Sequence, residues 1–114
     1  MLSFKTAKRL KKAGFQQPDL ELGQIWYDDF GGPRVSIREQ KSGDWLVFNG
    51  ALYFAPTATD ILKQLPEGIL LHRNHNDGFT VSEPLWGETG LQAESHPNAD
   101  EACALAWLQL NNNA

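Results

Sequence analysis

Apolar residues in the first half of the chain fall in short runs that turn-forming residues separate. The runs cover residues 25–27, 35–38, 45–48 and 51–54. Asn49-Gly50 between the last two runs is a strong signal for a tight hairpin. A cluster of acidic, glycine and proline residues at 28–33 marks another turn. The spacing predicts three or four antiparallel strands joined by short loops.

The second half shows a similar pattern. The apolar runs at 68–73 and 79–82 flank a polar stretch at 74–78 that contains Asp77-Gly78, as two strands of a hairpin flank their turn. A short run at 91–94 predicts a final edge strand.

Three segments carry helix signals. Ser3 can cap a helix that ends near Ala13, with Gly14 just beyond it. Thr57 and Asp60 have the spacing of a capping box and open a short helix that stops at Pro66. Asn98-x-x-Glu101 opens a third helix, over 99–110, which is apolar nearly all round and is therefore expected to be buried.

Together these elements predict a single α+β domain over residues 1–114. We expect an antiparallel sheet of about five strands, built as a meander of hairpins, with three helices packed mainly on one face. The helix at 99–110 is expected at the centre of the core, with Trp107 buried. A chain of this length can bury about two thirds of its surface without disulfides or metals.

Charge is spread unevenly along the chain. The net charge is −4, yet the first twelve residues hold five basic groups and no acidic one, which leaves −9 on the remainder. Lys8 and Lys12 are the binding candidates on this predicted helix. Like charges three and four residues apart repel, and an anionic partner would relieve that repulsion. We expect acidic groups elsewhere in the fold, or a homodimer interface, to relieve that repulsion.

The sequence also predicts the cellular compartment. Cys103 is the only cysteine, so the chain can form no internal disulfide, and no apolar stretch has the length of a signal peptide or membrane span. These features predict a soluble cytoplasmic protein without membrane contact. Cys103 itself lies within an apolar helix and is expected to be an inert buried thiol.

No segment has a catalytic, metal-binding or nucleotide-binding motif. His72 and His75 lie three apart in a predicted hairpin, and Asp28 and Asp29 are adjacent, so neither pair is expected to converge on one centre. The sequence therefore indicates no catalytic residue, no metal and no cofactor. A small enzyme or small-ligand binder that uses these four residues is kept as an alternative.

Aromatic residues gather in the strand region. Large apolar groups fall on both faces of the predicted strands. One face is expected to pack on the helices, and the other is either covered or exposed as a binding surface. The aromatic binding candidates are Trp26, Tyr27, Trp45, Tyr53 and Trp86.

Three segments carry a family resemblance. Residues 8–15, 55–62 and 98–111, with Ala55-Pro56-Thr57 and the Ala106-Trp107 ending among them, are similar to those of small phage- and prophage-type proteins of unknown function. The resemblance covers about a third of the chain and implies a fold, with no catalytic residues to carry over.

These observations favour a non-enzymatic module that binds another protein. A nucleic-acid accessory protein using the basic first helix is a further alternative. The acidic remainder argues against it, because binding to a duplex grows with the number of phosphates neutralised.

Overall fold

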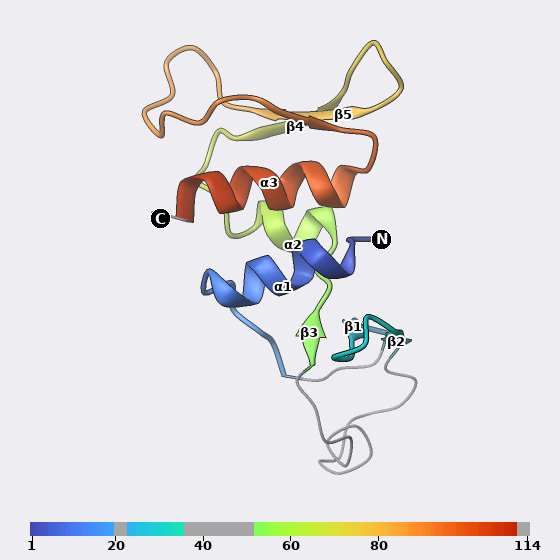
Figure 1. Ribbon diagram of the computed structural model, residues 1–114. Helices are drawn as coiled ribbons and strands as arrows, with labels where there is room; N and C mark the ends of the chain where they lie inside the picture. The colour runs from blue at the N-terminus through green and yellow to red at the C-terminus, as the bar shows by residue number, and fades with distance from the viewer. Residues whose placement is uncertain (20–22, 36–51, 112–114) are drawn as a thin grey trace.

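Three helices lie between two small antiparallel sheets in the computed structural model, which describes residues 1–19, 23–35 and 52–111 (Figure 1). The helices are α1 (Phe4–Lys12), α2 (Ala58–Leu62) and α3 (Ala99–Asn111). The strands are β1 (Ile25–Tyr27), β2 (Pro33–Val35), β3 (Tyr53–Phe54), β4 (Leu70–Arg73), β5 (Phe79–Ser82) and β6 (Glu94–His96). The predicted α+β class and the three helices are confirmed. The strands, however, form two sheets in place of the one expected.

The two sheets differ in topology. The first has the order β2-β1-β3, so β1 is central and pairs with a strand that follows it closely and with one that comes much later. The second is a β4-β5-β6 meander of neighbouring strands. Its first turn is the predicted one, with Asp77 at a positive φ of 57°. The predicted strand at 45–48, the part of the predicted strand at 35–38 that follows Val35, and the Asn49-Gly50 turn lie outside the described residues.

The helix α3 is the centre of the core, as its composition predicts. One side of it packs on β5 and β6, and the other contacts α1 and α2. Ala102, Ala104 and Ala106 are fully buried and let neighbouring elements approach closely. Trp107 is only 6% exposed and meets the Phe15 ring edge-on at 5.1 Å.

Local capping fixes where α1 begins and ends. The Ser3 hydroxyl accepts the Thr6 backbone N–H, which stabilises the first turn. At the other end Gly14 has a φ of 95°, and the Phe15 N–H reaches back to the Leu10 carbonyl at 2.9 Å. This glycine-terminated turn ends the helix and places Phe15 against the core.

The start of α3 uses only half of the predicted capping arrangement. Asn98 Oδ1 accepts the backbone N–H groups of Asp100 and Glu101, as an N-cap does. The Glu101 side chain contacts α1 instead, where it accepts hydrogen bonds from the Ser3 backbone N–H and the Thr6 hydroxyl. A residue expected to cap its own helix therefore joins two helices.

The last strand begins later than predicted, at Glu94 in place of residue 91. Gln109 of α3 explains the shift, because its side-chain amide binds both the N–H and the carbonyl of Gln92. This pairing takes the place of a neighbouring strand. Residues 91–93 consequently dock on the helix, and pairing with β5 starts only beyond them.

None of the helices in the described ranges is long and apolar enough to cross a lipid bilayer.

Candidate functional site

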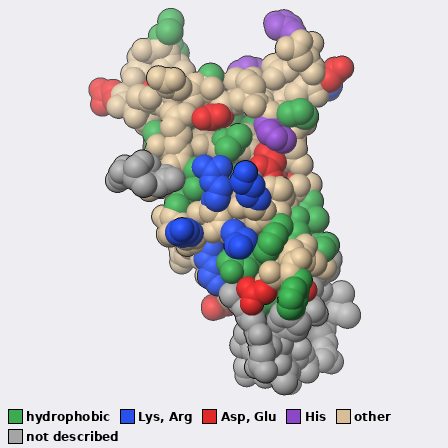
Figure 2. All heavy atoms as spheres, in the orientation of Figure 1, with side chains coloured by type: hydrophobic (Ala, Val, Ile, Leu, Met, Phe, Trp, Pro, Cys, Tyr) green, Lys and Arg blue, Asp and Glu red, His purple; other side chains and the backbone are tan. Residues whose placement is uncertain are grey.

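The exposed face of α1 carries the most concentrated charge in the described structure. Thr6, Ala7 and Leu10 are buried and form the narrow stripe that docks the helix. Phe4 is half-buried against the core, and the remaining positions lie at the surface. They hold five cationic side chains, which gather over α1 in Figure 2: Lys5, Lys8, Arg9, Lys11 and Lys12.

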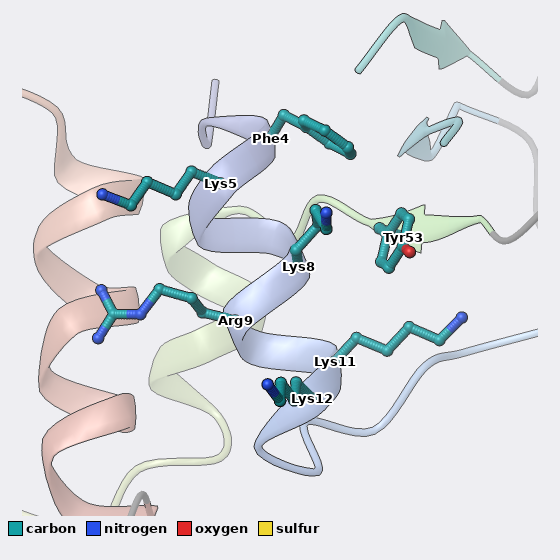
Figure 3. Close-up of a pocket in the computed structure, with 7 residues that line it drawn as sticks. All are labelled: Phe4, Lys5, Lys8, Arg9, Lys11, Lys12 and Tyr53. Atoms are coloured by element: carbon teal, nitrogen blue, oxygen red, sulfur yellow. The ribbon is translucent and has the colours of Figure 1, made fainter. Parts of the chain in front are cut away.

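These cations and two aromatic rings line a shallow groove of about 740 Å³ (Figure 3). We call it the basic groove; its residues are Phe4, Lys5, Lys8, Arg9, Lys11, Lys12 and Tyr53. All but Tyr53 come from α1. Tyr53 is brought to the helix by β3, which packs beside α1.

The rings form an apolar floor. Phe4 meets the Tyr53 ring edge-on at 5.8 Å between centroids and the Tyr27 ring at 5.5 Å. The turn after β1 packs closely against the Phe4 ring. A Cβ added at Gly31 of this turn would lie only 3.0 Å from that ring. Gly31 also has a φ of 83°, so a larger residue there would be strained as well as crowded.

Lysines lie over this floor. Lys8 Nζ lies 5.2 Å from the Phe4 ring centroid and 5.9 Å from that of Tyr53, and Lys11 Nζ lies 4.9 Å from the Tyr53 centroid. Lys11 Nζ also donates to the Leu52 carbonyl at 2.9 Å. Cation–π contacts of this kind hold the ammonium groups in place without neutralising them.

Tyr53 is kept as a neutral phenol. Burial raises the pKa of Tyr53, and the charge of Asp29 and a hydrogen bond with its carboxylate raise it further. The phenol is thereby held beside Asp29 at the edge of the groove.

No acidic side chain within the described ranges forms a salt bridge with any of the five cations. The expectation that acidic residues of the same fold would relieve their repulsion is therefore not met in that part of the chain.

The other aromatic candidates divide into three groups. Trp26 and Tyr27 are each 5% exposed, and they pack on Phe54 and on α1, so they belong to the core and not to a binding surface. This corrects their assignment. Trp45 lies outside the described residues. Trp86 is 82% exposed, in the loop between β5 and β6.

The four residues of the enzyme alternative do not converge. Asp28 is buried, and its Oδ1 accepts the N–H groups of Phe30 and Gly32 at 2.9 Å, so it stabilises a turn. His72 and His75 are exposed, on or next to β4 in the other sheet. The described residues contain no group of three histidine, cysteine or acidic side chains that could hold a metal ion.

Cys103 offers no nucleophile either. It is fully buried, and burial, together with the nearby Asp100 carboxylate, raises the pKa of its thiol to about 11. A thiol with that pKa is protonated at neutral pH and reacts slowly.

Of the groove residues, Lys8, Lys12 and Tyr53 were predicted as binding candidates, whereas Phe4, Lys5, Arg9 and Lys11 were not. The signal for Phe4 was available, because it lies four residues before Lys8 and therefore on the same face of the helix. The position of Tyr53 beside that face depends on which strand pairs with β1, and no local pattern encodes that choice.

Comparison of the chain with family models, with curated proteins and with solved structures finds no match. The resemblance to small phage-type proteins accordingly stays a prediction.

Proposed function

We propose that this protein is a non-enzymatic interaction module that binds an acidic segment of a partner protein in the basic groove. The single observation that carries the proposal is the set of five α1 cations that line one groove with Phe4 and Tyr53 and form no salt bridge with another described residue. Opposite charge steers and orients partners at such surfaces.

The chemistry of the groove matches a peptide with carboxylates and one large apolar side chain. Phe4 and Tyr53 offer ring surface, and the lysine stems add apolar lining below their ammonium groups. A carboxylate can then meet the cationic rim while an apolar side chain rests on the rings.

Nucleic acid fits less well. A nine-residue helix is roughly 13 Å long and can meet only a few phosphates. So few phosphate contacts give only weak binding at physiological salt, and the −9 charge on the rest of the chain opposes it.

The test is fluorescence anisotropy near 150 mM salt, where charges are screened over about 8 Å. The probe is a short fluorescein-labelled peptide of glutamates around one tryptophan. Lys8→Glu with Lys12→Glu should weaken its binding roughly tenfold or more, since each exposed pair is worth up to ~1 kcal/mol. Lys63→Glu, an exposed lysine outside the groove, should leave binding unchanged.

Two results would contradict the proposal. One is equal binding of a control peptide with lysines in place of the glutamates. The other is sub-micromolar binding of a single-stranded oligonucleotide at the same salt, lost in the Lys8→Glu, Lys12→Glu variant, which would favour the nucleic-acid alternative.

A further inference from the structure

The loop between β5 and β6 presents two apolar side chains at its tip. Leu85 is 103% exposed and Trp86 is 82% exposed, which is unusual for large apolar residues. They occupy the middle of a turn that the Gly87 N–H closes on the Pro84 carbonyl at 2.8 Å. We call Leu85 and Trp86 the loop tip.

The base of this loop is held by one carboxylate. Glu83 accepts the Thr89 hydroxyl at 2.5 Å, the Thr89 backbone N–H at 3.1 Å and the Gly90 N–H at 2.9 Å. Hydrogen bonds from Thr89, foremost its hydroxyl, lower the pKa of Glu83 and keep it ionised. A Cβ at Gly87 would lie 2.4 Å from Glu83 Oε2, so a larger residue there would force the Glu83 side chain to move.

These hydrogen bonds constrain the backbone that carries the apolar tip. Binding through such a tip loses little conformational entropy, which favours affinity. Tryptophan is also among the residues that most often anchor protein interfaces. The loop tip therefore has the properties of a binding anchor.

Charge around the loop tip is the opposite of that around the basic groove. Glu83 and Glu88 flank the tip, and residues 74–114 contain six acidic groups with no lysine or arginine. The first twelve residues contain five basic groups and no acidic one. The tip offers a tryptophan beside carboxylates, and the groove offers ammonium groups above an aromatic floor. Among the aromatic side chains, tryptophan forms the strongest cation–π contacts with such ammonium groups.

The two surfaces lie in different parts of the molecule. The loop projects from the second sheet at the upper left of Figure 1, whereas α1 lies below α3. In Figure 2 hydrophobic side chains lie at the end of that projection, well apart from the blue cluster over α1. Loop tip and groove of one molecule are therefore placed to contact other molecules.

We infer that the loop tip of one copy of this chain docks in the basic groove of a second copy. This inference rests on the proposed function and names its partner as the chain itself. Because the two contacting surfaces differ, the contact is heterologous, and each pair retains one free tip and one free groove. The copies then extend into a ring or an open chain. The contact is small, so its dissociation constant is expected in the range of roughly 10–100 μM, typical of transient interfaces.

Sedimentation velocity over a concentration series tests the inference. The average mass of the wild-type protein should rise with concentration at ~50 mM salt and fall back toward the monomer as salt screens the charges. Trp86→Ala, which removes the tip, and the Lys8→Glu, Lys12→Glu pair, which alters the groove, should each remain monomeric. Circular dichroism spectra check that both variants fold, and Lys63→Glu should associate like the wild type.

Mixing the two defective variants gives the sharpest result. Trp86→Ala retains an intact groove and the charge-reversed protein retains an intact tip, so an equal mixture should form a heterodimer and stop there. A wild-type chain that stays monomeric at several hundred micromolar would overturn the inference, as would association that survives either variant or a mixture that stays monomeric. If the acidic peptide still binds in that case, only the identity of the partner is wrong; if it does not, the proposed function fails too.

Discussion

The Glu101 carboxylate of α3 accepts a hydrogen bond from the Thr6 hydroxyl of α1 at 2.7 Å, although the two residues are 95 positions apart in sequence. The same carboxylate accepts the Ser3 backbone N–H, so one buried charge satisfies groups in the first turn of α1. The position of the basic groove relative to the core therefore depends on this residue.

Replacing Glu101 with glutamine should destabilise the fold by about 1.5–3 kcal/mol, because hydrogen bonds to a charged group are lost and the amide brings a donor toward the Ser3 N–H. Urea denaturation at pH 7 measures the change. Glu67→Gln, at an exposed position, serves as the control and should differ from the wild type by less than ~0.5 kcal/mol. An equal effect at the two positions would show that Glu101 does not join the helices energetically.

The same residue predicts a pH dependence. Burial alone would raise the pKa of Glu101, but hydrogen bonds from Ser3 and Thr6 outweigh it, so its pKa lies below the ordinary value of 4.5. A carboxyl whose pKa is lower in the folded state contributes stability that is fully present above about pH 4.5 and is lost as the pH falls through the folded-state value. The stability difference between wild type and Glu101→Gln should therefore shrink below pH 4.5. A difference that stays constant down to pH 2 would contradict this assignment.

Trp107→Ala should cost about 3–5 kcal/mol, because it leaves a cavity beside Phe15 in the centre of the core. The matched control is Trp86→Ala, which makes the same truncation at a site that is 82% exposed. Thermal melting should separate the two variants widely. Similar melting temperatures would mean that α3 is not the centre of the core.

Gly87→Ala should disturb the loop tip without disturbing the core. The new methyl group would overlap the Glu83 carboxylate and displace it from Thr89 and Gly90. Amide hydrogen exchange at those two residues should become roughly tenfold faster or more, and self-association should weaken with it. Glu88→Ala, in the same loop but without a crowded position, should leave exchange there unchanged.

Signals confined to a few neighbouring residues predicted the structure well. The Ser3 cap, the Gly14 helix end, the Thr57–Asp60 capping box and the Asp77 turn are all confirmed, because each is a contact between groups close in sequence. The burial of Trp107 followed in the same way from the composition of its helix.

Contacts between distant segments could not be read from the sequence. β1 pairs with β3 across a long stretch of chain, and this pairing covers Trp26 and brings Tyr53 to α1. The Gln109 amide likewise replaces a strand at Gln92. In both cases several partners have suitable hydrophobicity, and only packing of the whole chain selects one. For this reason Lys8, Lys12 and Tyr53 were each predicted as binding candidates, but their assembly with Phe4 into one groove was not.

The link from Glu101 to α1 also bears on when the basic groove forms during synthesis. A helix as short as α1, with so narrow an apolar stripe, is not stable in water until it docks. A ribosome that adds ~5–20 residues per second needs about 5–20 s to extend the chain from Thr6 to Glu101. The nascent chain therefore carries its five basic side chains on a segment that lacks its contact with Glu101 throughout that interval. The groove is complete only after α3 has emerged, so nascent chains cannot engage one another through it before the rest of the fold is in place.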